Sequence, residues 1–148
     1  MTKPDDAAAY FNEGFSSSQA VISVFSEDLG LELETARKIS CGFGAGMGRT
    51  DNICGAVTGA MMVIGMKYGK AQAGDDTAKE KTYALVQEFL KQFKEQNGSI
   101  SCTELLGYNL RDPGQRRQAH ESDTVATKCP EFARNAVTIL EKLSDETR

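Results

Sequence analysis

The chain has 148 residues, 40% of them hydrophobic and 26% charged, with a formal net charge of −4 and a pI near 5.1. These values are typical of one globular domain, residues 1–148, that buries a core of its own. They give no basic footprint, so we expect no nucleic acid partner. A single histidine, His120, excludes a multi-histidine metal site and is expected to be solvated in a polar loop.

The first residues, MTKPDDAAAYFNEG, are acidic early and contain no apolar core of a secretory signal. The longest apolar run, Ala56 to Met66, is too short to span a bilayer. We therefore expect a cytoplasmic protein that does not span a membrane. In a reducing compartment, four cysteines indicate metal binding, catalysis or core packing more often than structural disulfides.

The apolar spacing predicts an all-α domain of five or six helices around a central helix of small residues. Expected helices include 3–12, a helix opened by a Ser16–Gln19 capping box, and 32–40. Asp51 is expected to cap the central helix, which ends near Tyr68. A long helix ending at Asn97-Gly98 and a short one opened by Ser101 follow, then mostly loop over 108–127 and a last helix opened by Cys129-Pro130.

The stretch from Cys41 to Gly69 organises the chain. It joins a glycine-rich segment, GFGAGMG, to the central helix. The segment does not match G-x-G-x-x-G and follows a helix, so its glycines indicate positive φ or close approach of another segment rather than a phosphate site. Gly55 and Gly59, four residues apart, are compatible with close packing inside the chain or in a homodimer.

Three cysteines are predicted at helix starts: Cys54, Cys102 and Cys129. Unpaired N–H groups at a helix N-terminus favour a thiolate and lower its pKa. Clustered thiolates exchange with disulfides, bind a soft metal or iron–sulfur cluster, or attack an electrophile. Burial as small hydrophobic residues is the alternative for each of them.

Several motifs together resemble the C_GCAxxG_C_C family of redox-active proteins. They are Cys54-Gly55-Ala56-Val57-Thr58-Gly59, the upstream Gly-Phe-Ser-Ser-Ser-Gln-Ala-Val, the glycine-rich segment, Cys102-Thr103-Glu104-Leu105-Leu106-Gly107 and Cys129-Pro130. The resemblance implies a redox role carried by four characteristic cysteines. Where the family has its first cysteine, this chain has Ser17, and Cys41 is an extra cysteine that could substitute in space.

Our leading hypothesis is a thiol-based redox protein in which Cys54, Cys102, Cys129 and Cys41 are the candidate catalytic residues, with no bound cofactor and an unidentified redox partner. Cys102 and Cys129 are expected to lie close enough to form a disulfide. A [2Fe–2S] cluster or another soft metal on Cys54, Cys102 and Cys129 is the first alternative, since related domains occur in iron–sulfur electron-transfer proteins. A non-catalytic helical interaction protein is the second.

Overall fold

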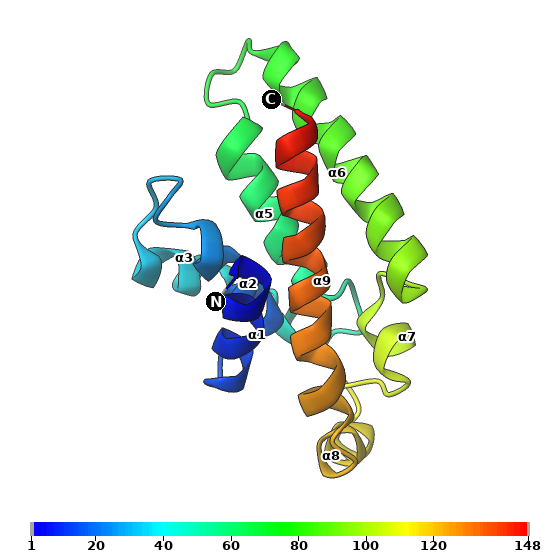
Figure 1. The fold of residues 1–148 in the computed structure, drawn as a ribbon. Helices are drawn as coiled ribbons and strands as arrows, with labels where there is room; N and C mark the ends of the chain where they lie inside the picture. The colour runs from blue at the N-terminus through cyan, green and yellow to red at the C-terminus, as the bar shows by residue number, and fades with distance from the viewer. Residues whose placement is uncertain (1, 148) are drawn as a thin grey trace.

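The chain folds entirely into helices in a computed structural model that describes residues 2–147 (Figure 1). Within those residues the only β pairing is an isolated bridge between Ile53 and Ser101. The elements in chain order are α1 (Lys3–Asn12), α2 (Ser17–Phe25), α3 (Leu33–Cys41), α4 (Gly44–Arg49), α5 (Gly55–Tyr68), α6 (Asp76–Asn97), α7 (Cys102–Leu106), α8 (Pro113–Glu121) and α9 (Thr124–Glu146).

The core lies where α5, α6 and α9 run side by side, with α1 and α2 against α9 on the opposite side from α6 (Figure 1). Large buried side chains from α2, α6 and α9 surround the small residues of α5. Ala56, Val57 and Ala60 of α5 are completely buried. The all-α fold around a small-residue helix is therefore confirmed.

The glycines of α5 are used inside the chain. A Cβ at Gly59 would lie 2.8 Å from the carbonyl oxygen of Ser18, and one at Gly55 would lie 3.0 Å from the Ser18 nitrogen. These contacts bring the N-terminal turn of α2 directly onto α5. The same glycines therefore no longer argue for a homodimer, and the oligomeric state stays a prediction.

Several predicted helix ends are confirmed. The Ser16 hydroxyl accepts from the backbone N–H of Gln19, whose side chain in turn accepts from the Ser16 N–H. Gly98 ends α6 in the left-handed conformation, with φ of 93°. At α7 the Ser101 hydroxyl caps Glu104 as predicted.

The helix count was too low, and the region 108–127 shows why. Asp112 caps Gln115 and Pro113 occupies the first helical position, so the Asp-Pro pair opens α8 instead of a turn. α9 then begins at Thr124, five residues before Cys129. Pro130 lies inside this helix, where it costs one backbone hydrogen bond. The expected loop over 108–127 and the helix start at Cys129-Pro130 were both wrong.

The glycine-rich segment forms α4, which is not a regular right-handed helix. Five consecutive residues, Ala45 to Arg49, have φ between 55° and 75°, the left-handed region. Glycine adopts this region freely, whereas each non-glycine residue there costs about 1–2 kcal/mol. The positive φ expected of the glycines is found at Gly46 and Gly48.

The start of α5 also differs from the prediction. Asp51 has a positive φ of 61° and does not cap the helix. Ile53 is held extended by its pairing with Ser101, so the helix begins at Gly55 and Cys54 is its N-cap residue. Among the described helices, none is both long and apolar enough to cross a bilayer.

Candidate functional site

An antiparallel bridge brings Cys54 and Cys102 together. The Cys54 N–H donates to the carbonyl of Ile100 at 2.8 Å, and the Cys102 N–H donates to the carbonyl of Asn52 at 3.0 Å. These bonds flank the paired residues Ile53 and Ser101. Because side chains alternate along paired strands, both cysteines leave the bridge on the same face and then enter α5 and α7.

Gly46 of α4 packs directly against this pair. A Cβ built on Gly46 would lie 2.8 Å from the Cβ of Cys102 and 3.3 Å from the Asn52 nitrogen. The left-handed turn thus brings bare backbone against the cysteine. The close approach expected of the glycines is found here.

Cys129 reaches the same place from α9. It is half-buried and packs against the small hydrophobic cluster that contains Cys102, Leu106 and Leu110. The charge of Cys54 and that of Cys102 both influence the pKa of Cys129. The three predicted cysteines are therefore neighbours in space, and all of them are free thiols.

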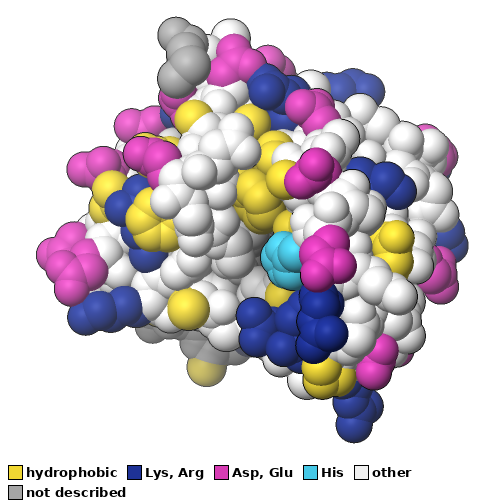
Figure 2. All heavy atoms as spheres, turned by 90° about the horizontal axis from the view of Figure 1, so that it is seen from below, with side chains coloured by type: hydrophobic (Ala, Val, Ile, Leu, Met, Phe, Trp, Pro, Cys, Tyr) yellow, Lys and Arg dark blue, Asp and Glu magenta, His cyan; other side chains and the backbone are white. Residues whose placement is uncertain are grey.

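A pocket of about 490 Å³ opens onto the thiols between the ends of α1 and α8 and the starts of α2 and α9. Figure 2 looks onto this face: hydrophobic side chains lie at the base of a hollow, and the histidine and several basic side chains lie along one side. All four cysteines line the pocket. Ser17, which the motif resemblance places at the first cysteine position of the C_GCAxxG_C_C pattern, lines it too.

Burial raises the pKa of all three clustered thiols. The pKa of Cys54 rises to about 11, because loss of solvent outweighs the backbone N–H groups of Ala56 and Val57 that favour its thiolate. The pKa of Cys102 rises to about 12 through burial first, then through the charges of Cys54 and Asp51. The lowered pKa expected from helix N-termini was therefore wrong.

The same balance holds for Cys129. Burial is the largest cause, followed by the charges of Cys54 and Cys102, and together they raise its pKa to about 12 against the smaller opposing effect of Lys128. Mutual repulsion means that once one thiol loses its proton, the others hold theirs more tightly. The cluster is fully protonated near neutral pH.

Cys41 and Ser17 lie at the same pocket but differ in exposure. Cys41, the last residue of α3, is exposed, whereas Ser17 at the start of α2 is 7% exposed. Cys41 exerts no charge effect on the pKa of the three clustered thiols. Cys41 thus lies at the rim, whereas Ser17 lies deeper.

The arrangement does not form a metal-binding geometry in the described part of the chain. No three side chains of His, Cys, Asp or Glu in residues 2–147 are grouped to hold a metal ion. Three thiols in one pocket are the right donors for a soft metal, but their present positions do not converge on a common centre. We derive no step through a metal.

Basic residues line the pocket, which no sequence pattern had indicated. His120 is exposed, as expected, and both His120 and the exposed Arg49 line the pocket. Arg116 of α8 lines it as well. No spacing in the sequence could show this, because α8 itself was expected to be loop.

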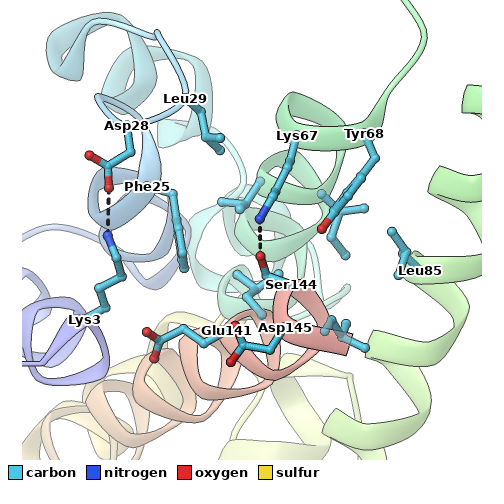
Figure 3. Close-up of a pocket in the computed structure, with 14 residues that line it drawn as sticks. Lys3, Phe25, Asp28, Leu29, Lys67, Tyr68, Leu85, Glu141, Ser144 and Asp145 are labelled. Atoms are coloured by element: carbon cyan, nitrogen blue, oxygen red, sulfur yellow. Dashed lines mark hydrogen bonds and ion pairs between the residues drawn. The ribbon is translucent and has the colours of Figure 1, made fainter. Parts of the chain in front are cut away.

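A second pocket, of about 260 Å³, lies between α2, α5 and α9 and contains no cysteine (Figure 3). Lys3 pairs with Asp28 at 2.9 Å across its mouth, and Lys67 donates to the Ser144 hydroxyl. The charged side chains that line this second pocket thus already have partners within the chain, at least at Lys3, Asp28 and Lys67. The thiol pocket is the better candidate site.

The fold and the site define an all-helical protein with clustered cysteine thiols at a pocket. The model of the family described as "putative redox-active protein (C_GCAxxG_C_C)" matches residues 15–143, so the chain belongs to this family. The resemblance predicted from the motifs is thereby confirmed. No curated protein and no solved structure matched the chain.

Proposed function

We propose that the protein is a thiol-based redox protein that exchanges its clustered dithiol with a disulfide. The observation that carries this proposal is the meeting of Cys54, Cys102 and Cys129 at one pocket. Cysteines that serve only as small hydrophobic residues of the core would not be expected to line one solvent-accessible pocket together. Four free thiols also fit a reducing compartment such as the cytoplasm.

The order of events follows from the position of Cys54. It is the N-cap residue of α5, and the backbone N–H groups of Ala56 and Val57 support its thiolate. It is therefore the thiol that attacks the disulfide of the redox partner. Cys102 or Cys129 then attacks the resulting mixed disulfide and releases the partner's second thiol.

The electron flow is expected to run from this protein to its partner. A strongly oxidising cysteine pair depends on a stabilised thiolate in its reduced form. Here burial outweighs the N–H groups that support the Cys54 thiolate, so the reduced form gains no net stabilisation from a thiolate. We therefore expect the cluster to work as an electron donor.

The test is an anaerobic redox titration against dithiothreitol, with the remaining thiols alkylated and located by peptide mass spectrometry. We expect the wild type to form one intramolecular disulfide within the cluster. Cys54→Ser should lose the exchange with external disulfides. Cys41→Ser, the matched control at the rim, should keep both properties.

Two results would overturn the proposal. The first is a protein that keeps all its thiols reduced over the whole titration. The second is iron or another soft metal, in stoichiometric amount, in anaerobically purified protein that loses it on Cys54→Ser or Cys129→Ser. That outcome would favour the cluster-binding alternative, which requires the thiols to move together.

A further inference from the structure

The thiol pocket is basic in an acidic protein. The chain has 21 Asp and Glu residues against 17 Lys and Arg. Yet the described side chains that line the pocket include two arginines and the histidine, and no carboxylate. In a protein with a net negative charge, randomly placed side chains would more often give an acidic pocket. The basic lining therefore favours a negatively charged ligand.

None of these basic groups is neutralised by a neighbour. The Arg116 guanidinium donates only to backbone carbonyls, its Nε to Leu110 at 2.8 Å and its Nη2 to Arg111 at 3.4 Å. The five ion pairs found between described residues include neither arginine of the pocket nor His120. The positive charge is therefore available to a ligand.

Charges of both signs lie just outside the pocket, and Figure 2 shows acidic side chains next to the histidine. The Asp51 carboxylate is close enough to raise the pKa of Cys102, but it accepts from the Thr103 hydroxyl and does not line the pocket. On the other side Lys128 acts on Cys129 with the opposite sign. The described residues that line the pocket itself carry no negative charge.

We infer that the pocket takes a small disulfide that carries negative charge on both halves, such as a dicarboxylate disulfide. This inference rests on the proposed function and names the substrate class of the same site. A volume of about 490 Å³ lies within the usual range for small-molecule sites, about 300–1,000 Å³. Apolar residues at the base suit the methylene and sulfur atoms, and the basic rim suits the carboxylates.

The reaction balances without a further reagent. The Cys54 thiolate attacks one sulfur of the substrate, forming a mixed disulfide and releasing the first substrate thiol. Cys102 or Cys129 attacks the Cys54 sulfur, forming the protein disulfide and releasing the second thiol. The substrate gains two electrons, and the two cysteine protons end on the two released thiols.

The test compares three disulfides of similar size but different charge: dithiodipropionate (dianionic), hydroxyethyl disulfide (neutral) and cystamine (dicationic). Each is mixed with fully reduced protein under anaerobic conditions, and the loss of cluster thiols is followed. We expect dithiodipropionate to react about tenfold faster than cystamine at low ionic strength, relative to their rates with a free thiol. The preference should shrink as salt is added.

Arg49→Gln should lower the ratio of the dithiodipropionate rate to the hydroxyethyl disulfide rate about threefold. Arg49→Lys should restore most of the loss because it keeps the charge. Arg117→Gln is the matched control: Arg117 lies on α8, is exposed and does not line the pocket. Arg117→Gln changes the net charge of the protein by the same amount as Arg49→Gln. If the effect of Arg49 is local to the pocket, Arg117→Gln should leave the dithiodipropionate rate unchanged.

A binding measurement separates this inference from the proposed redox function. Suberate and hexanediamine are the carbon analogues of dithiodipropionate and cystamine, and neither can react. We expect suberate alone to shift the NMR signals of pocket residues. If all three disulfides react at equal rates relative to their rates with a free thiol, and neither analogue binds preferentially, the preference for an anionic substrate is refuted. The redox function is then still supported. If suberate binds but no disulfide reacts, the redox function falls and the anion site stands.

Discussion

Replacing Gly46 by alanine would test whether the left-handed turn of α4 holds the thiol cluster in place. Gly46 has φ of 73°, and a Cβ there would lie 2.8 Å from the Cβ of Cys102. Real Cβ atoms do not approach so closely, so either α4 or the start of α7 must move. The perturbation therefore acts on the site and on folding at once.

Two costs add up for Gly46→Ala. The left-handed backbone costs a residue with a Cβ about 1–2 kcal/mol. Overpacking against Cys102 adds about 1–3 kcal/mol, since neither Cβ is the free end of a flexible side chain. We expect a loss of about 2–5 kcal/mol in the free energy of unfolding.

Gly107→Ala is the matched control. Gly107 ends α7 with φ of 76°, and nothing lies within 4 Å of a Cβ built there. It carries the backbone cost alone, about 1–2 kcal/mol. The difference between the two variants measures the contact with Cys102.

Both variants are measured by urea unfolding and by the rate at which the cluster forms its disulfide under a mild oxidant. We expect Gly46→Ala to be the less stable variant and to form the disulfide more slowly, because Cys102 is displaced. Equal stability and equal rates in the two variants would refute the role assigned to Gly46.

Two further predictions concern single side chains. Near neutral pH the exposed Cys41 should be alkylated first, and the alkylation rate of Cys54 should rise with pH until about pH 11. Because the folded state favours the protonated Cys54 thiol, the protein should lose stability as pH rises from 9.0, the pKa of the unfolded thiol, to about 11, its pKa in the folded state. Mass spectrometry of timed iodoacetamide reactions checks the order, and a flat Cys54 profile above pH 9 contradicts it. Ser17→Cys should change stability by less than about 0.5 kcal/mol, since the Ser17 hydroxyl makes no hydrogen bond within the described residues, and it should add a thiol to the pocket. Ser18→Ala, its neighbour, should cost about 1–2 kcal/mol, because it removes the buried bond from the Ser18 hydroxyl to the Ser40 carbonyl at 2.9 Å; urea unfolding of both variants separates them.

Local signals in the sequence predicted the elements that depend on neighbours a few residues apart. The Ser16–Gln19 capping box and the Gly98 helix end are both present. Both arise from side-chain and backbone geometry within one turn, so they do not need the rest of the fold. The same reasoning failed at Pro130, because the packing of α9 against α1 and α6 outweighs one lost hydrogen bond.

The charge state of the thiols could not be predicted in the same way. A helix N-terminus lowers a thiol pKa and burial raises it, and burial is a property of the whole fold. At Cys54, with 6% exposure, burial wins. At Cys129 there is no helix start at all.

The helical class followed from local periodicity in the sequence, and the cysteine-containing motifs indicated the family and the three cysteines that line the pocket. Only the tertiary structure decided how they meet. The bridge between Ile53 and Ser101 joins residues 48 positions apart, and the approach of Gly46 to Cys102 spans 56. Contacts over such separations, and the basic rim that Arg49 and Arg116 bring to the pocket from α4 and α8, exist only once the chain has folded.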